Sequence, residues 1–188
     1  MPAWEIVGLP DISIKESKER VRTAIKNSGL EFPSRRIVVN LAPADSRKEG
    51  PFFDLPIAVG ILIATEAICN TNINNYAFIG ELSLDGRINK VQGILPMCIE
   101  AKKLGIERII IPEENAAEAS VIDGIDIMPA KKLIDVTAHL NGVQSLEKVM
   151  TDGNELFKKD KKYKFNFSDV RGQENIKRAL EISAAGRT

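Results

Sequence analysis

The stretch FIGELSLDGRINKV, residues 78–91, decides the fold class of this 188-residue chain. Asp85-Gly86 between two extended runs is a strong signal for a tight hairpin turn, so Phe78–Leu82 is predicted to pair antiparallel with Arg87–Val91. Strands and helices alternate on both sides of this hairpin. A hairpin inside such an alternation predicts a mixed sheet packed with helices, an α+β (α/β-like) fold, rather than a purely parallel doubly wound sheet.

The first 29 residues predict a strand followed by a helix. Ala3–Gly8 alternates loosely between apolar and polar residues, as an early strand does. Asp11 and Ser13 precede the helix, and Ser13 and Glu16 have the spacing of a capping box. Gly29 is the expected stop. The helical face that we expect to be buried is formed by Ile14, Val21, Ala24, Ile25 and Ser28.

Residues 36–41 predict a second strand, with three side chains on one face and two on the other. The first face is formed by Ile37, Val39 and Leu41, and the second by Val38 and Asn40. Asp54 then begins a helix that is predicted to run through Ile68 and is apolar nearly all round. Such a helix is normally sandwiched in a core.

Downstream of the hairpin the alternation continues to Gly142. The predicted elements are a helix marked by Ile94, Met97, Cys98 and Ala101 and closed by Gly105, a buried strand at 108–111, a helix opened by Pro112-Glu113-Glu114, a short strand at 125–127, and a helix carrying Leu133, Val136 and Leu140.

Composition limits the class of protein. The chain is 44% hydrophobic and 28% charged, which is typical of a soluble globular protein. Lysine and arginine total 26, as do aspartate and glutamate, so the charge balance does not favour a strongly basic nucleic-acid-binding domain. Residues 55–64, the longest apolar stretch, are too few to span a bilayer, and no signal peptide opens the chain, which predicts a cytoplasmic protein. Cys69 and Cys98 are predicted to be buried, reduced thiols.

Motifs for catalysis and metal binding are largely missing from the sequence. The single histidine, His139, has no second histidine or suitable cysteine with which to build a triad, so we expect an ordinary surface or half-buried side chain. Acidic pairs such as Glu113-Glu114 are explained as helix-start or solvated charges. No phosphate-binding loop of the Gly-x-x-x-x-Gly-Lys-Ser/Thr type occurs, so the chain alone does not supply a complete P-loop ATP site.

The periodic pattern stops between Gly142 and Tyr163, where five lysines lie among few apolar residues. This composition is typical of a solvated linker, and contact of these lysines with nucleic acid is the alternative. A new helix, Glu174–Ala184, follows. The predicted organisation is a first domain over residues 1–145, a linker over 146–165 and the start of a second domain over 166–188.

Two segments carry a family resemblance. The motifs of the first are, in order, EIVGLPD at 5–11, KES at 15–17 with RVR at 20–22, NLAPAD at 40–45, FDLPIA at 53–58 and GELSLDG at 80–86. This ordered set resembles the front, Lon-protease-like (ChlI-type) domain of magnesium-chelatase-related AAA+ ATPases of the ComM/YifB family. The motifs of the second are FSDVRGQ at 167–173 and KRALEISAAG at 177–186. They resemble the entry into the AAA+ module of the same family.

The resemblance implies the Lon peptidase-like fold, which is also the ribosomal S5 domain 2-like fold. Lon peptidases use a Ser–Lys dyad, and here Phe52 occupies the position of the serine and Leu95 that of the lysine. A phenyl ring has no nucleophilic oxygen and a leucine accepts no proton, so no peptidase activity is expected. The alternative is a relocated dyad, which Ser46 or Ser83 would form with a nearby lysine, Lys48 or Lys90.

The resemblance also implies an ATP site outside this sequence. In the family the phosphate loop follows the Ala-Ala-Gly segment by a few residues, and further strands precede the segment that begins here at Pro2, so the chain is expected to be trimmed at both ends. ATP and Mg²⁺ are expected cofactors of the intact protein and none is expected for the fragment. In the intact protein the adenine edge is expected to be bordered by Asp169, Val170, Gly172 and Gln173.

By resemblance, the intact protein is an ATPase and, in ComM-type members, a DNA helicase that promotes branch migration in natural transformation. This chain would be a non-catalytic accessory domain; its expected partners are its own AAA+ module and a ring-forming homo-oligomer, a hexamer, with DNA as a further partner and no membrane. If DNA binds, we expect the contacts at Arg35, Arg36, Arg47 and Lys48. The alternatives are a Lon-like peptidase with a relocated dyad and a magnesium chelatase subunit.

Overall fold

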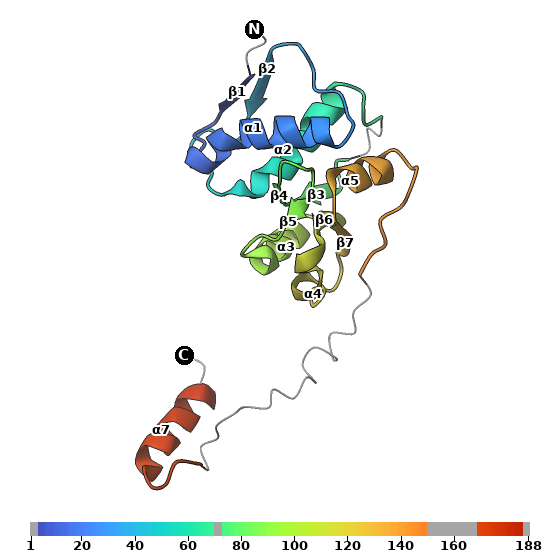
Figure 1. Cartoon of the computed structure of the whole chain (residues 1–188). Helices are drawn as coiled ribbons and strands as arrows, with labels where there is room; N and C mark the ends of the chain where they lie inside the picture. The colour runs from blue at the N-terminus through green and yellow to red at the C-terminus, as the bar shows by residue number, and fades with distance from the viewer. Residues whose placement is uncertain (1–3, 70–72, 150–168, 186–188) are drawn as a thin grey trace. The chain divides into compact units, whose positions relative to one another are not determined.

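The computed structural model describes residues 4–69, 73–149 and 169–185 (Figure 1). Its contacts divide the chain into two units, Met1–Gly153 and Asn154–Thr188. The predicted linker over residues 146–165 lies outside the described residues from residue 150 on, as does the predicted segment at 166–168, so these boundaries stay predictions.

The first unit begins with a strand, a helix and a second strand. Strand β1 (Trp4–Val7) pairs in parallel with β2 (Ile37–Asn40), and helix α1 (Ile12–Asn27) connects them. The prediction of a Ser13 cap was wrong. The helix is capped by Asp11, whose carboxylate accepts a hydrogen bond from the Ile14 N–H at 2.8 Å, because an aspartate placed one residue before the first turn already satisfies that donor.

The apolar helix predicted from Asp54 is confirmed at its start and is shorter than predicted at its end. A single 3₁₀ turn, η1 (Pro51–Phe53), leads directly into α2 (Asp54–Ala64). The helix stops before Ile68 because Glu66 has a left-handed φ of 60°, which an α-helix cannot continue through. Ile68 still folds back into the core, 2% exposed, and its N–H donates to the carbonyl of Leu62.

The predicted hairpin is confirmed at its turn, but its first arm belongs to two strands. Strands β4 (Glu81–Leu82) and β5 (Ile88–Asn89) pair antiparallel across Asp85-Gly86, whereas β3 (Tyr76–Phe78) pairs in parallel with a later strand. Gly80 lies between β3 and β4. A Cβ at this position would lie 2.5 Å from Cγ2 of Ile88, so the chain approaches β5 too closely for a side chain there.

The remaining elements of the first unit build a parallel sheet with order β3-β6-β7. They are α3 (Ile94–Lys103), β6 (Arg108–Pro112), η2 (Glu113–Asn115), α4 (Ala116–Ala119), β7 (Asp126–Ala130) and α5 (Leu133–Leu140). Parallel and antiparallel pairs are both present, which confirms the mixed α+β class. Within the described residues, however, the strands form three small sheets rather than one.

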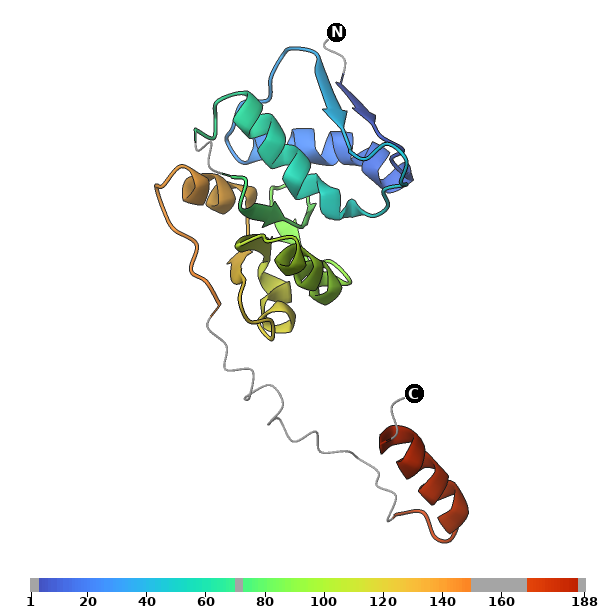
Figure 2. The ribbon, with the colours of Figure 1, turned by 180° about the vertical axis from the view of Figure 1, so that it is seen from behind.

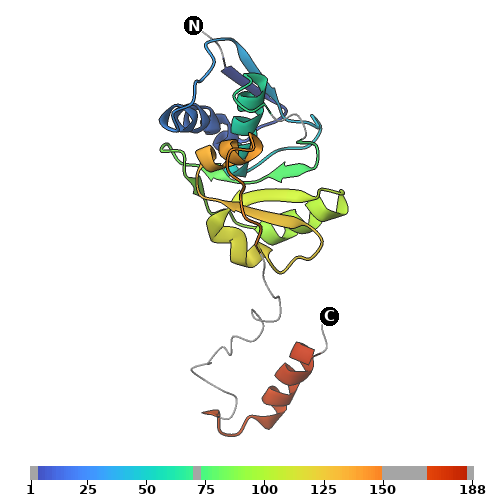
Figure 3. The same ribbon diagram turned by 90° about the vertical axis from the view of Figure 1, so that its right-hand side faces the viewer.

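The central strand β6 separates two apolar clusters. Ile109, Ile110 and Ile111 are all fully buried, as expected for a strand covered on both faces. Ile110 belongs to the first cluster, with residues of α1, α2 and α5, while Ile109 and Ile111 belong to the second, with residues of α3 and α4. Figures 1 and 3 show these two groups of helices on opposite sides of the sheet.

The two cysteines differ in exposure. Cys98 is buried in the second cluster, as predicted, but Cys69 is exposed and that prediction was wrong. Because α2 ends at Ala64, Cys69 lies beyond the helix. Its backbone N–H donates to the side chain of Asn141 at 2.9 Å.

The second unit contains helix α7 (Glu174–Ala185), which confirms the helix predicted over 174–184. Ile176, Leu180 and Ile182 are each at least half exposed on it. Over the described residues, no helix is long and apolar enough to cross a bilayer.

Candidate functional site

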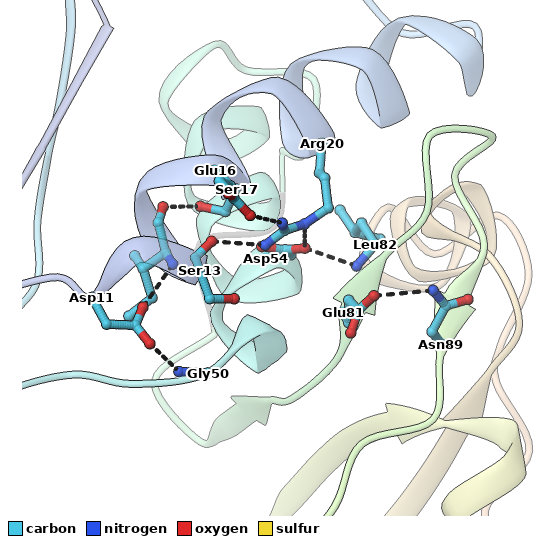
Figure 4. A network of polar contacts seen from close by, with 11 residues as sticks. Asp11, Ser13, Glu16, Ser17, Arg20, Gly50, Asp54, Glu81, Leu82 and Asn89 are labelled. Carbon is cyan, nitrogen blue, oxygen red and sulfur yellow. Dashed lines mark hydrogen bonds and ion pairs between the residues drawn. The ribbon is translucent and has the colours of Figure 1, made fainter.

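The turn at the start of α2 is the candidate site, because the family resemblance places a catalytic serine there. Gly50 begins the turn with a left-handed φ of 96°, and a Cβ at this position would lie 2.8 Å from the ring of Phe52. The Gly50 N–H donates to Oδ2 of Asp11 at 3.1 Å, while Oδ1 of Asp11 caps α1 (Figure 4). One carboxylate therefore fixes both the turn and the start of α1.

Phe52 and Phe53 fill the middle of the turn with two stacked rings, 4.6 Å between centroids. Both rings are half-buried, and they pack on different cores: Phe53 against the first apolar cluster and Phe52 against the second. The backbone is fixed as well, since Gly80 donates to the Phe52 carbonyl at 3.1 Å and receives the Leu55 N–H at 3.0 Å. The turn thus joins the two cores.

Asp54, the first residue of α2, is fully buried and paired. Arg20 of α1 donates to both of its oxygens, from Nε at 2.7 Å and from Nη2 at 3.1 Å, and the Leu82 N–H of β4 donates to Oδ2 at 3.1 Å. Arg20 also donates to the Ser13 carbonyl at 3.0 Å. The carboxylate therefore connects α1, α2 and β4, as Figure 4 shows.

Burial raises the pKa of Asp54 above its ordinary value, and the hydrogen bonds from Arg20 and Leu82 act in the opposite direction. The hydrogen bond to Asp54 raises the pKa of Arg20. Both carboxylate oxygens receive donors, and a protonated carboxyl would have to turn one of its oxygens into a donor facing them. The pair is therefore a buried, hydrogen-bonded ion pair, of the kind that costs stability when one partner is removed.

The ion pair is the main residue set at this site that the sequence did not reveal. Arg20 and Asp54 are 34 positions apart, and nothing in the local pattern joins them. A signal was present in hindsight: Asp54 is the one charged residue of an otherwise apolar helix, and a charge in such a setting is buried only when it is paired.

Leu95, at the expected position of the dyad lysine, is the second residue of α3 and is half-buried. Its neighbours Ile94 and Cys98 belong to the same apolar cluster on which Phe52 packs. Burial raises the pKa of the Cys98 thiol to about 11, with a further contribution from Glu118. At neutral pH this thiol is protonated and is a poor nucleophile.

Two residues of the alternative, relocated dyad, Lys48 and Ser83, make other contacts. The ammonium of Lys48 donates to the backbone carbonyls of Pro43 and Ser46. The hydroxyl of Ser83 bonds to the Asp85 carboxylate at 2.8 Å and to the Arg87 carbonyl at 3.1 Å. Within the described residues, neither serine hydroxyl has a recorded bond to a lysine.

His139 is half-buried, as predicted. Its Nδ1 accepts the Leu146 N–H at 3.1 Å, and its Nε2 lies 3.3 Å from the Tyr76 hydroxyl. Burial lowers the pKa of His139, and the positive charge of Arg108 lowers it further. No group of three or more acidic, histidine or cysteine side chains suited to a metal ion occurs in the part of the chain that the structure describes.

Three of the four basic residues expected to meet DNA are exposed and the fourth is buried. Arg35, Arg36 and Arg47 are exposed; Arg36 pairs with Glu5 at 3.6 Å and Arg47 with Glu49 at 3.2 Å. Lys48 is only 7% exposed. Its ammonium holds the loop before the turn, so the structure does not present Lys48 to DNA as the sequence led us to expect, and the DNA contact itself stays a prediction.

The residues expected at the adenine edge lie in the second unit, ahead of α7. Asp169, Val170, Gly172 and Gln173 are exposed, and both Gly172 and Gln173 adopt a left-handed φ, 70° and 61°. Their role in adenine binding stays a prediction.

Comparisons with known proteins agree with this architecture. The family model described as Subunit ChlI of Mg-chelatase matches residues 1–115. Competence protein ComM of Haemophilus influenzae is 39% identical over 191 residues, and YifB of Escherichia coli is 41% identical over 187 residues; each match covers 99% of this chain and 36% of the relative.

The chain therefore spans about a third of the length of these relatives. Lon protease 2 of Bacillus subtilis is 33% identical over 123 residues, which cover 65% of this chain and 22% of that protein. In this chain the turn at residues 50–54 carries Phe52, and its Asp54 is paired with Arg20. By the family match over residues 1–115 and the similarity to ComM and YifB, the chain belongs to the ChlI family of magnesium-chelatase-related proteins.

Proposed function

We propose that this chain is a non-catalytic accessory domain of a magnesium-chelatase-like AAA+ ATPase. The observation that supports this most is the turn at residues 50–54. Two stacked aromatic rings fill it, and its acidic residue, Asp54, is buried in an ion pair with Arg20. A phenyl ring lies where the resemblance expects the serine nucleophile, and the acidic residue beside it serves to join α1, α2 and β4.

The proposal extends to the intact protein through the similarity to ComM. The intact protein is an ATP-driven DNA helicase of the branch-migration type that acts in natural transformation, with ATP and Mg²⁺ held by its AAA+ module. The module assembles as a homo-oligomeric ring, a hexamer, and the domain described here contributes to assembly of the ring or to a channel for DNA. Asp169, Val170, Gly172 and Gln173 border the adenine.

The DNA contact in this proposal involves Arg35, Arg36 and Arg47. Their guanidinium groups are exposed, and the partners of Arg36 and Arg47 are exposed carboxylates, so these surface pairs cost little to exchange for phosphate. Phosphates are the group that such arginines neutralise, with release of counterions.

Titration of the chain with a fluorescent four-way DNA junction over a salt series tests the DNA contact. We expect binding that weakens linearly with the logarithm of salt concentration. Replacing Arg35, Arg36 and Arg47 with glutamine should reduce the slope by about 2 to 3, since each neutralised phosphate contributes about 0.9. Glutamine at Lys102, Lys103 and Lys131, which are exposed on other elements, is the matched control. An absence of binding at low salt would contradict the DNA contact and leave the assembly role.

A further inference from the structure

A groove with a volume of about 560 Å³ lies between β2 and α2. One wall is residues 35–41, and the other is a row of α2 residues spaced three and four apart, which includes Pro56, Gly60 and Ala64. Figure 2 shows α2 and β2 side by side in the view from behind. At about 3.3 Å per residue, the β2 wall is roughly 20 Å long, enough for a strand of about six residues.

The β2 edge along this groove is open. Within the described residues β2 pairs only with β1. Leu41 donates its N–H to the Val7 carbonyl, which shows that residue 41, and with it residues 39 and 37, turn their backbone groups towards β1. Because consecutive residues of a strand alternate, the backbone groups of Val38 and Asn40 face the open edge. Such unpaired groups are a template for an added strand.

The α2 wall is shaped for close approach of another backbone. Gly60 lies in the middle of the helix, where glycine costs stability, and nothing within its own unit lies within 4 Å of a Cβ placed there. Gly60 and Ala64 are both exposed. The small exposed residues of this apolar helix therefore leave room for an added strand beside the open edge of β2.

The charge around the groove selects the occupant. Its lining contains two arginines, Arg35 and Arg36, and no carboxylate. Arg36 is paired with Glu5, whereas Arg35 is exposed and makes no ion pair or hydrogen bond among the described residues. An occupant that is apolar along its length and acidic near Arg35 would match both the walls and the charge.

We infer that this groove binds an extended segment of a separate polypeptide, which adds as a strand to the open edge of β2 between Arg35 and Leu41. The segment presents alternate apolar side chains to α2 and an acidic residue to Arg35. Backbone hydrogen bonds to Val38 and Asn40 supply affinity, and the apolar wall and Arg35 supply specificity, as in other cases of strand addition.

Two fluorescein-labelled heptapeptides test the inference, Glu-Val-Thr-Val-Ala-Val-Thr and the same peptide with its glutamate moved to the last position. We expect at least one to bind the chain by fluorescence anisotropy. On saturation, amide hydrogen exchange at Val38 and Asn40 should slow by about tenfold or more, as new hydrogen bonds protect those amides, while exchange at Val39, which already faces β1, stays unchanged.

Gly60→Leu is the matched variant, because Gly60 lines the groove and a Cβ placed there would have nothing within 4 Å, which leaves room for a larger side chain on that side. It should weaken binding by about tenfold or more, equivalent to about 1.4 kcal/mol, without lowering the Tm. Ala117→Leu, a similar small-to-large change at an exposed position of α4, should leave binding unchanged. Lysine in place of the peptide's glutamate should weaken binding by about threefold or more at low salt.

Three results would overturn the inference. The first is that neither peptide binds and exchange at Val38 and Asn40 is unaffected. The second is that Gly60→Leu binds both peptides as tightly as the unaltered chain. The third is a concentration-dependent dimer in sedimentation experiments that Gly60→Leu abolishes, since the occupant would then be a second copy of this chain.

Discussion

The two sides of helix α2 are both apolar but have different surroundings. The inner side is covered completely: Leu55, Ala58 and Leu62 are 0% exposed, and the helix begins at a carboxylate buried with Arg20. The outer side exposes Gly60 and lines an open groove. An apolar helix sequence therefore predicts that the helix is buried, but it does not say which of its sides is covered by other residues of the same chain.

The largest expected effect concerns the ion pair at the start of the inner side. Asp54→Ala leaves the Leu82 N–H without its buried acceptor and the partly exposed Arg20 without its main partner. It should lower the free energy of unfolding by about 2–4 kcal/mol, measured by urea denaturation, less than for a fully buried pair because Arg20 keeps contact with solvent and with the Ser13 carbonyl. The control is the double change Arg20→Met with Asp54→Leu, which removes both charges and should recover much of the loss. A loss below about 1 kcal/mol for Asp54→Ala would show that the pair does not hold the junction.

A comparable effect is expected for the apolar packing on the same side. Leu62→Ala should cost about 2–4 kcal/mol, because it opens a cavity in the first apolar cluster. Ala64→Ser, two residues later on the outer side, should change the free energy of unfolding by less than about 0.5 kcal/mol. Equal losses in the free energy of unfolding for the two variants would contradict the difference in burial between the two sides.

Substitution of two glycines by alanine should change the free energy of unfolding in opposite directions. Gly60→Ala should raise the free energy of unfolding by about 0.5–1 kcal/mol, since it removes a mid-helix glycine with open space beside it. Gly80→Ala should lower it by about 1–3 kcal/mol, because the new Cβ would lie against Ile88. Thermal unfolding measures both, and a destabilising Gly60→Ala would show that the groove is closed in solution.

The smallest expected effect is a pH dependence of stability that arises from His139. This side chain contacts Tyr76, which packs on the first apolar cluster. The folded pKa of His139 is lowered, so the unfolded chain takes up the proton first as pH falls. The stability contributed by neutral His139 is present above about pH 6.5 and is lost as pH falls from there towards the folded pKa. Thermal unfolding of His139→Gln should show a smaller loss between about pH 7 and about pH 5.5 than the unaltered chain.

Sequence alone predicted the elements whose signals are local. Asp85-Gly86 marked the hairpin turn, the run at 109–111 marked a buried strand, and Gly29 marked the end of α1. The expectation that Phe52 and Leu95 occupy the dyad positions came from the same kind of residue-by-residue reading, and it stays a prediction.

Features that depend on tertiary contacts were not predicted. The burial of Lys48 follows from carbonyls that a folded loop brings together, and the exposure of Cys69 follows from where α2 ends. The pairing of Arg20 with Asp54 requires two helices to meet, and the groove beside Gly60 requires β2 to end a sheet. None of these is set by local residue propensity.

The turn at residues 50–54 joins the two cores, and we predict that it does no peptidase chemistry. Cleavage of fluorescently labelled casein over a series of chain concentrations tests this prediction, with Ser46→Ala and Ser83→Ala as companion variants. We predict no cleavage above the protein-free blank at any concentration and identical traces for all three chains. Cleavage that rises with chain concentration and disappears in one serine variant would contradict the prediction.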